Sequence, residues 1–556
     1  SSNMKHIYFT LFILIIKYCD AQNTVGLIQH NVGTLDNGYV LFAPISSNNT
    51  YLIDKCGNLV KSWASGYKPG QSCYILPDGT LLRSGNANNT TFNAGGKGGI
   101  IEKIDWTGTV TWSYTLSSTT ECQHHDIKPL SNGNILAIVW ESKTNTEAIA
   151  QGRNPSLTTT TVWSEKIVEI QPVGLTGGTI VWEWHLWDHL IQDFDNTKVN
   201  YGTVASNPQL ININYSASSS TVTGQDWIHL NSIDYNETLN QILVSSHSFD
   251  EVWIIDHSTT TSQAASHTGG NSNRGGDLLY RWGNPRAYNN GSISTQKFFG
   301  QHNAHWIQSG FPYQNQIMVF NNGNGRTGGN YSTIEIINPP VSGYTYTSTL
   351  PFLPSTTSWM YNTENNYSLY AQNISGAEQL SNGNVIFCNG PNGTFKEINA
   401  TGTTLWEYVN PVNGTGVISQ GTAPTLNLAF RCSFYPSDYA GFIGKTIVAG
   451  GILENVNTVS SSCNLASSLP EVLSDLDISF FPNPANDKIA IQLKDLTTEQ
   501  VNVELFDVVG ILVQKSAINQ GSKITYLDTR TLYEGTYFVK LINNNSVITK
   551  KVVVIK

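Results

Sequence analysis

The chain has 556 residues, which is more than one ordinary domain requires and enough to bury a large core. Charged residues make up only 13% of it, whereas aromatic residues reach 11%, so the composition excludes a disordered chain and is typical of an all-β extracellular protein. The net charge of −10, without a run of basic residues, argues against a nucleic-acid partner.

The first predicted element is a secretory signal peptide over residues 1–21. A basic residue and a short apolar run between Met4 and Lys17 precede Cys19-Asp-Ala21, so we expect cleavage after Ala21. The run is too short for a resident membrane span, and no other stretch approaches a transmembrane segment. Of the seven cysteines, six follow this segment, which permits disulfides in an exported chain without fixing their pairing.

A repeat of short strands runs from Tyr39 to about Gly451. One half of the unit is a turn and an apolar strand, as in Leu130-Ser-Asn-Gly-Asn-Ile-Leu136. The other half is two strands around a Gly turn, the second of which bears Trp, as in the segment 101–112. Each unit supplies four strands, the content of one propeller blade. Separate β-sandwiches would not share the Trp-bearing half.

The repeat predicts a six-bladed β-propeller over residues 22–451, with seven blades as the alternative. The expected blades begin near Gln71, His125, His229, His302, Gln372 and Arg431. The segment Tyr39–Trp63 is a second half without a first, so we expect it to complete the sixth blade. Closing a ring with both chain ends removes the exposed sheet edge.

After a predicted linker at residues 452–477 the pattern changes. Short alternating strands are expected at residues 480–493, 501–510 and 535–542, which predicts a small Ig-like β-sandwich over residues 478–556.

This tail resembles the C-terminal sorting domain of the type IX secretion system of Bacteroidetes. The matching features are the Pro482-Asn-Pro-Ala485 box, the Leu505-Phe-Asp segment and the basic pair Lys550-Lys551. The resemblance implies an export address that the secretion machinery recognises, and therefore a secreted or cell-surface protein. We expect no chemistry in the tail.

Three histidines, His125, His229 and His302, occupy the same phase in separate blades. Because the first strand of each blade lines the central channel, we expect their rings to converge at one opening. Asp126 and Asp226 are the nearby carboxylates that can orient imidazoles. Converging imidazoles suit either a metal such as iron or zinc or nucleophilic catalysis, and composition leaves both possibilities open. Bonding to the backbone of a neighbouring blade is the purely structural alternative.

The motifs around these histidines resemble the bacterial arylsulfate sulfotransferase family. The motifs are Gln123-His-His-Asp-Ile127, Asp226-Trp-Ile-His-Leu-Asn231, Glu251-Val-Trp-Ile-Ile-Asp256, Tyr280-Arg-Trp-Gly-Asn-Pro285 and Gln301-His-Asn-Ala304 with Val319-Phe-Asn-Asn-Gly323. The resemblance implies a propeller that moves a sulfuryl group from an aryl sulfate donor to a phenolic acceptor through a sulfohistidine, without a phosphoadenosine donor or another cofactor. The chain indeed has no GxxxxGK[ST] phosphate loop.

By the same resemblance, His302 is expected to be the nucleophile. His229 and His125 are expected to bind the sulfuryl oxygens, as imidazolium groups near neutral pH, and to protonate the leaving phenolate. The remaining residues expected to bind substrate are His247, Asn231, His124, His305 and Arg326. No metal ligand is predicted.

One position departs from the family pattern. After Val244-Ser-Ser246 the family usually has Arg, whereas this chain has His247, which is charged only part of the time. We expect a more acidic optimum, or Arg326 or Arg281 in place of the family arginine. The rival hypotheses are a decayed site in a binding or surface propeller, and a metal-dependent enzyme that uses the histidine cluster.

Overall fold

Antiparallel strands dominate the computed structural model, which describes residues 23–31, 35–157, 160–216, 225–347, 349–362, 368–454, 463, 478–493, 496–497, 500–508, 511–543 and 546–556. The expected signal peptide and most of the expected linker lie outside the described residues. The chain divides into two units, Ser1–Cys463 and Asn464–Lys556, each described by itself below.

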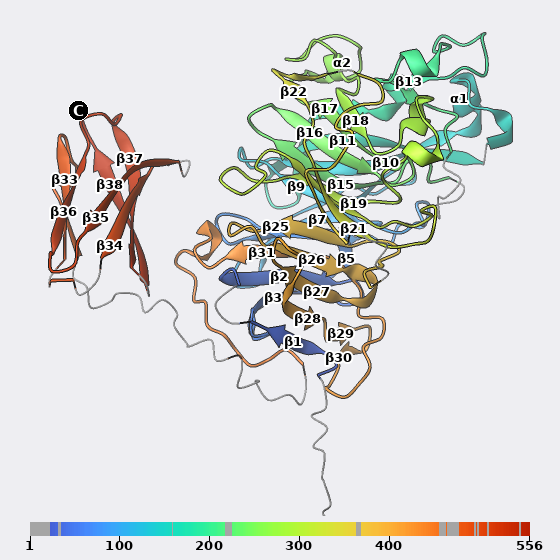
Figure 1. Cartoon of the computed structure of the whole chain (residues 1–556). Coiled ribbons are helices and arrows are strands. Elements are labelled where there is room, and N and C mark those ends of the chain that lie inside the picture. Colours follow the sequence, from blue (N-terminus) through green and yellow to red (C-terminus); the bar gives the residue numbers. More distant parts are fainter. Residues whose placement is uncertain are drawn as a thin grey trace, which may run out of the picture. The chain divides into compact units, whose positions relative to one another are not determined.

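Six large antiparallel sheets build the first unit in the described part of the chain (Figure 1). Their strands are β5–β8 (Pro69–Ile75, Leu81–Asn86, Gly99–Ile104, Val110–Thr115), β9–β12 (Glu121–Pro129, Ile135–Thr144, Thr161–Val173, Gly177–His185), β15–β18 (Leu230–Asn236, Gln241–Ser246, Glu251–Asp256, Tyr280–Trp282), β19–β21 with β24 (His302–Trp306, Ile317–Asn321, Thr333–Ile337, Trp359–Tyr361), β25–β28 (Gly376–Gln379, Val385–Asn389, Thr394–Ile398, Thr404–Val409) and β31 with β2–β4 (Ala429–Pro436, Gly38–Pro44, Asn49–Asp54, Leu59–Ala64).

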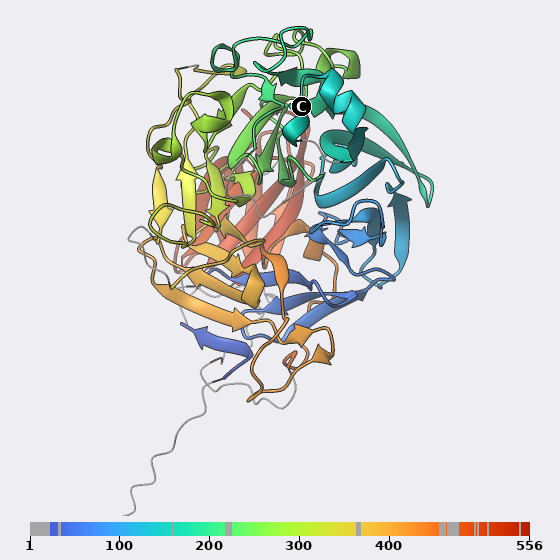
Figure 2. The ribbon, with the colours of Figure 1, turned by 90° about the vertical axis from the view of Figure 1, so that its right-hand side faces the viewer.

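The first strands of these sheets form a closed cycle. β5 packs against β9, β9 against β15, β15 against β19, β19 against β25, β25 against β31, and β31 back against β5. Figure 2 shows the sheets following one another around the unit from blue through green and yellow to orange. The arrangement is all-β and propeller-like. Two predicted starts are displaced by four residues each: the second sheet begins at Glu121 and not at His125, and the fifth begins at Gly376 and not at Gln372.

The two ends of the first unit meet in one sheet, as the sequence predicts. β31 pairs with β2 through partners such as Tyr435 and Tyr39, and β3 and β4 complete the sheet. A strand that the repeat does not predict, β1 (Gly26–His30), adds a fifth member to the preceding sheet by pairing with β28. Both additions cover strand edges that would otherwise be free to pair with another chain.

The tryptophans of the outer strands link each sheet to the next. Each indole N–H donates to a backbone carbonyl of the following sheet, and the bonds are Trp63 to Asp105 (3.1 Å), Trp112 to Gly177 (2.8 Å), Trp184 to Gly276 (2.7 Å), Trp282 to Pro354 (2.9 Å), Trp359 to Ala400 (3.1 Å) and Trp406 to Lys55 (2.7 Å). The last bond returns to the sheet that contains the first tryptophan. The repeated Trp is therefore an inter-sheet latch that occurs once per sheet.

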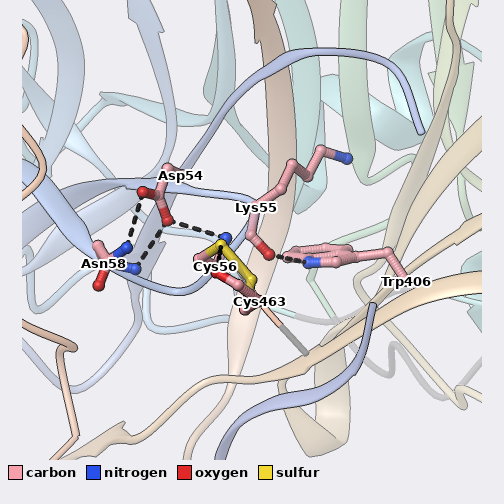
Figure 3. Close-up of a disulfide and its surroundings, with 6 residues drawn as sticks. All are labelled: Asp54, Lys55, Cys56, Asn58, Trp406 and Cys463. Carbon is pink, nitrogen blue, oxygen red and sulfur yellow. Dashed lines mark hydrogen bonds between the residues drawn. A yellow bond between two sulfur atoms is a disulfide. The ribbon is translucent and has the colours of Figure 1, made fainter. Parts of the chain in front are cut away.

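A disulfide joins Cys56, in the turn between β3 and β4, to Cys463, 407 residues later (Figure 3). The carboxylate of Asp54 holds this turn, because it accepts from the backbone N–H groups of Cys56 and Asn58, both at 2.9 Å. The Trp406–Lys55 latch lies beside it (Figure 3). The disulfide thus attaches the end of the first unit to the same sheet in which β31 and β2 close the ring. The free cysteines among the described residues are Cys73, Cys122, Cys388 and Cys432.

Helices in the described residues are short. They are α1 (Asn145–Ala150), α2 (Thr261–Ala264) and the 3₁₀ turns Pro155–Leu157, Leu186–His189, Val204–Ser206, Pro285–Tyr288, Ile293–Thr295, Gly390–Asn392 and Ala440–Phe442. No helix in these ranges has the length and apolar character needed to span a bilayer. Small two-stranded ladders complete the unit: β13 (Leu190–Ile191) with β14 (Ile211–Asn212), β22 (Val341–Ser342) with β23 (Thr345–Tyr346), and β29 (Val412–Asn413) with β30 (Gly416–Val417).

The second unit consists of two sheets with a core of their own. One sheet is β32 (Ile478–Phe481), β33 (Lys488–Leu493) and β36 (Ile524–Asp528), and the other is β35 (Leu512–Ile518), β34 (Val501–Phe506), β37 (Gly535–Asn543) and β38 (Ser546–Val554). Ile491 of the first sheet and Val503 of the second belong to one buried apolar cluster. The predicted strands are present, and β35, β36 and β38 are additional.

Candidate active site

The three predicted histidines come together, and a fourth joins them. The ring centres of His125 and His229 are 4.5 Å apart, those of His229 and His247 are 5.3 Å apart, and those of His247 and His302 are 5.5 Å apart. These four residues, which we call the imidazole cluster, are buried and come from the second, third and fourth sheets of the chain.

Local backbone geometry turns these rings inward. His125 and His229 have φ values of +51° and +56°, in the left-handed region that residues other than glycine rarely adopt. The pairing of β9 with β10 shifts register at this point of β9, which is the mark of a β-bulge. Gly96 makes room, since a Cβ there would stand 2.0 Å from the His125 ring. Strained backbone of this kind is concentrated at functional sites.

His302 is held through one nitrogen only. Its Nδ1 lies 2.8 Å from Oδ1 of Asn322 and 3.1 Å from the carbonyl of Gly300, which are both acceptors. The amide of Asn322 cannot turn over, because its Nδ2 donates to the carbonyls of Ala371 and Ile374. Nδ1 therefore carries the proton and Nε2 the lone pair. Burial lowers the pKa of His302 to about 3, so the ring is neutral.

A hydrogen-bonded chain leads from His125 into the second sheet. Nδ1 of His125 is 2.8 Å from Nδ1 of His124, and Nε2 of His124 is 2.8 Å from Oε2 of Glu165. Burial, with the charge of Asp226, raises the pKa of Glu165 well above its usual range. Burial lowers the pKa of His124 well below its own. A protonated Glu165 then donates to His124, which donates to His125, and Nε2 of His125 bears a proton.

His229 is hydrogen-bonded to a carboxylate. Its Nδ1 is 2.6 Å from Oδ2 of Asp226, whose other oxygen accepts the indole N–H of Trp140 at 3.1 Å. Trp140 also stacks on His124, with ring centres 3.9 Å apart. Asp226 thus orients His229, as the sequence predicts for this carboxylate. Asp126 faces elsewhere: it accepts from Tyr74 at 2.7 Å.

His247 stands between His229 and His302 with a buried Nδ1 that has no hydrogen-bond partner. Burial lowers the pKa values of His247 and His125 well below their usual range. From the sequence we expect His125 to donate as an imidazolium near neutral pH, whereas these lowered pKa values favour the neutral form of both rings. They are neutral and can donate only through one N–H each.

Two residues that the sequence analysis left without a role complete the surroundings. The Phe430 ring faces His125 and His302, with centre distances of 6.0 and 6.4 Å. The guanidinium of Arg431 is close enough to oppose the protonation of His302. It bonds to Asp126 at 3.0 Å and keeps a buried Nε without a partner. Both residues lie in β31, more than a hundred residues from any cluster histidine, so only folding reveals their position.

The other predicted residues lie around the cluster or outside it. Asn231 donates to the carbonyl of Gln301 at 2.7 Å and has a buried, unpartnered Oδ1. His305 bonds to the carbonyl of Asn303 at 3.0 Å. Arg326 donates to the carbonyl of Tyr331 and to the hydroxyl of Thr333 at the start of β21.

Arg281 is fully buried against Glu251. Among the described contacts, neither Arg326 nor Arg281 bonds to an imidazole of the cluster.

Comparison with solved structures finds distant similarity. A protein of unknown function from Bacteroides caccae is 12% identical over 68% of this chain and 95% of its own, with a TM-score of 0.38. A streptogramin B lyase is 12% identical over 74% and 98%, with a TM-score of 0.33. The periplasmic gluconolactonase of Pseudomonas aeruginosa is 9% identical over 88% and 99%, with a TM-score of 0.32. No curated protein matches the chain in sequence.

Two protein families match the sequence. Residues 479–556 match the secretion system C-terminal sorting domain, which marks the chain for type IX export to the cell surface or the medium. Residues 28–422, most of the chain and all four members of the imidazole cluster, match the arylsulfotransferase (ASST) family. The chain therefore belongs to the arylsulfotransferase family and is an aryl-sulfate sulfotransferase that needs no phosphoadenosine donor.

Proposed function

We propose that the protein transfers a sulfuryl group from an aryl sulfate ester to a phenolic acceptor in a ping-pong cycle, with a sulfohistidine at His302 as the intermediate. The observation that carries this proposal is the anchoring of His302 through Nδ1 by Asn322 and Gly300. It leaves the lone pair of Nε2 for attack. With its pKa lowered to about 3 by burial, the ring remains an unprotonated nucleophile throughout the neutral range.

In the first half-reaction Nε2 of His302 attacks sulfur, the N–S bond forms, and the bond from sulfur to the aryl oxygen breaks. The electron pair of that bond leaves on the phenolate oxygen. Nδ1 keeps its proton, which Asn322 accepts as a hydrogen bond, so the sulfated ring is a cationic and therefore good leaving group for the second half-reaction.

The leaving phenolate takes its proton from Nε2 of His125. The proton of His124 then moves to Nδ1 of His125, and the proton of Glu165 moves to Nε2 of His124, so Glu165 ends as a carboxylate. When the acceptor phenol attacks the sulfohistidine, its proton returns along the same chain to Glu165. The relay therefore stores one proton between the two half-reactions, and protons balance over the cycle.

His229 and His247 are assigned to the oxygens of the sulfuryl group. Asp226 supports a donating His229, and the unpartnered nitrogen of His247 suits an anionic oxygen beside His302. Arg431 supplies the permanent positive charge that the family arginine would give at position 247. Although burial opposes its charge, the neighbouring Asp126 keeps its pKa above the usual value.

We also propose that the six large sheets are the blades of a six-bladed β-propeller. The closed cycle of first strands and the six tryptophan latches support this count. The proposed boundaries remain 1–21 for a signal peptide, 22–451 for the propeller, 452–477 for a linker and 478–556 for an Ig-like sorting sandwich.

The test is to trap the intermediate. The full chain is mixed with a chromogenic aryl sulfate without acceptor, and phenol release and sulfated peptides are measured. Wild type should release one equivalent of phenol in a burst and carry a sulfuryl group on His302, and a phenolic acceptor should discharge it. His302→Ala should give neither. His185→Ala, which changes a partly exposed histidine outside the cluster, is the control and should behave as wild type.

Other outcomes of the same experiment would refute the covalent assignment or favour one of the two rival functions. Sulfation at another residue, or full activity in His302→Ala, would refute the covalent assignment. Activity that a chelator abolishes and that survives His302→Ala would favour a metal-dependent enzyme. Binding of aryl sulfate without turnover in wild type would favour a binding propeller.

A further inference from the structure

Three side chains outside the imidazole cluster meet where two neighbouring sheets join. His189 ends the turn Leu186–His189, which follows β12, whereas His267 and Asp277 lie between α2 and β18 of the next sheet. Nδ1 of His189 is 2.9 Å and Nδ1 of His267 is 2.7 Å from the same Oδ1 of Asp277. The three ligand atoms all lie within 4.8 Å of one another.

The hydrogen bonds of His189 require a cation at this place. Its Nε2 is 2.8 Å from the carbonyl of Ala264, so Nε2 must carry a proton. A neutral His189 would then direct the lone pair of Nδ1 at the carboxylate oxygen of Asp277, which is also an acceptor. Two acceptors at 2.9 Å repel each other. Either a second proton or a metal ion must therefore lie between them.

The surroundings hold His189 in position independently of any ion. The Trp184 indole lies parallel to its ring, with centres 5.6 Å apart, and donates to the carbonyl of Gly276 at 2.7 Å. A side chain at Gly276 is not admitted, since its Cβ would stand 2.5 Å from Nε2 of His189. His189 is fully buried and Asp277 is 8% exposed. A ligand fixed through its second nitrogen is the usual arrangement at metal sites.

We propose that His189, His267 and Asp277 bind a divalent transition-metal ion, with Zn²⁺ as the ion that fits best. Two imidazole nitrogens and one carboxylate oxygen suit zinc and its neighbours, whereas Ca²⁺ and Mg²⁺ prefer oxygen alone. Zinc bonds of about 2.0–2.2 Å require the three atoms to separate by a few tenths of an ångström. His267, whose side chain is 61% exposed, can move to allow this and leaves a fourth position for water.

An ion here would tie the second large sheet to the third. It would reinforce the Trp184 latch, which joins the same two sheets a residue away from Asp277. The second group of convergent ligands among the described residues, His30 with Cys56 and Cys463, is not equivalent, because its sulfurs are joined in the disulfide.

The experiment titrates the full chain, purified without a polyhistidine tag and stripped with chelator, with Zn²⁺ by calorimetry and with Co²⁺ by absorption spectroscopy. The variants are His267→Ala, an exposed position where folding is not at risk, and Asp277→Asn. His302→Ala is measured in parallel because the imidazole cluster can itself take up zinc. His185→Ala, a half-exposed histidine with two carboxylate partners, is the matched surface control.

Wild type, His302→Ala and His185→Ala should bind one Zn²⁺ at this site, give a cobalt spectrum with nitrogen ligands, and unfold at a higher temperature when zinc is present. His267→Ala and Asp277→Asn should bind at least about tenfold more weakly and lose the thermal shift. Equal binding by these two variants and wild type would overturn the proposal. So would loss of the ion only in His302→Ala. Absence of binding in wild type would mean that a proton, not a metal, bridges His189 and Asp277.

Discussion

At the scale of single residues, the proposed role of each imidazole depends on the group that hydrogen-bonds to its far nitrogen. Asn322 fixes the proton of His302 on Nδ1, Glu165 fixes that of His125 on Nε2, and Asp226 holds His229. Three similar rings thereby suit the three different roles that we propose for them: nucleophile, proton donor and oxygen-binding group. For His302 and His229 the partners are amide, carbonyl and carboxylate oxygens, which can only accept, whereas the assignment of His125 depends on a protonated Glu165 that donates through His124.

The relay predicts a specific defect for Glu165→Gln. Glutamine has the same shape and can still accept from Leu230 and donate to His124, but it cannot give up and regain a proton. With a poor leaving group such as an alkyl-substituted phenol, kcat should fall about 100-fold, within the usual range for acid–base groups. With a nitrophenol, which needs no proton, the burst should be almost unchanged. The measurement is the burst rate against the pKa of the leaving phenol.

The matched control is Glu169→Gln, because Glu169 lies in the same strand, is also buried, and bonds to His257 at 2.9 Å outside the imidazole cluster. It should leave both burst rates as in wild type. An equal fall for good and poor leaving groups in Glu165→Gln would indicate a purely structural role for Glu165. No fall at all would exclude the relay.

The histidines of the site could be predicted at this scale, but the residues around them that set their hydrogen bonds and charge could not. The motif at residues 301–304 and the two upstream histidine motifs predict His302, His229 and His125 because these short segments resemble the motifs of the family. Glu165 and Arg431 have no such context: Glu165 is an ordinary residue within a long strand, and Arg431 reaches Asp126 across 305 positions of sequence. Charge states were also out of reach, since they depend on burial that no local pattern encodes.

At the scale of elements, the tryptophan repeat has a physical reason. The Trp-bearing strand lies at or near the outer edge of each sheet, β28 being covered by β1, and a large indole there can cover the neighbouring sheet while its N–H satisfies a carbonyl. Periodicity alone predicts the strand and its Trp. It does not predict the carbonyl acceptor, because that acceptor belongs to the next repeat. The edge strand β1 escaped prediction because Gly26–His30 is a single isolated strand without the repeat motif.

Loss of the ring-closing latch should therefore weaken the first unit. Trp406→Phe removes the donor to the Lys55 carbonyl in a fully buried setting and should lower the free energy of unfolding by about 1–3 kcal/mol. Trp106→Phe is the control, since Trp106 packs edge-on against Trp63 and has no latch bond among the described contacts. Urea unfolding measured by fluorescence compares the two. A larger loss in Trp106→Phe would show that indole packing, not the bond, stabilises the junction.

At the scale of the whole molecule, the ring is closed by chain ends far apart in sequence. The pairing of β2 with β31, the Trp406 latch and the Cys56–Cys463 disulfide all act on one sheet. The sequence predicts the strand exchange, because an unpaired half-unit at one end requires its complement at the other. The disulfide partners were not predictable, as six cysteines give too many pairings without the fold. The second unit has a separate core.

This separation leads to a prediction for the disulfide. The double variant Cys56→Ser with Cys463→Ser should destabilise the first unit by about 2–4 kcal/mol, because the cross-link restricts a long loop of the unfolded chain. The transition of the second unit should remain where it is. Calorimetry of the full chain resolves the two, with the isolated segment 478–556 as the reference for the second. Cys122→Ser, which alters a buried free thiol, controls for the loss of a sulfur atom. If the unfolding transitions of both units moved together, the stability of the second unit would depend on the closed ring of the first. If neither transition moved, strand pairing without the disulfide would be enough to keep the ring closed.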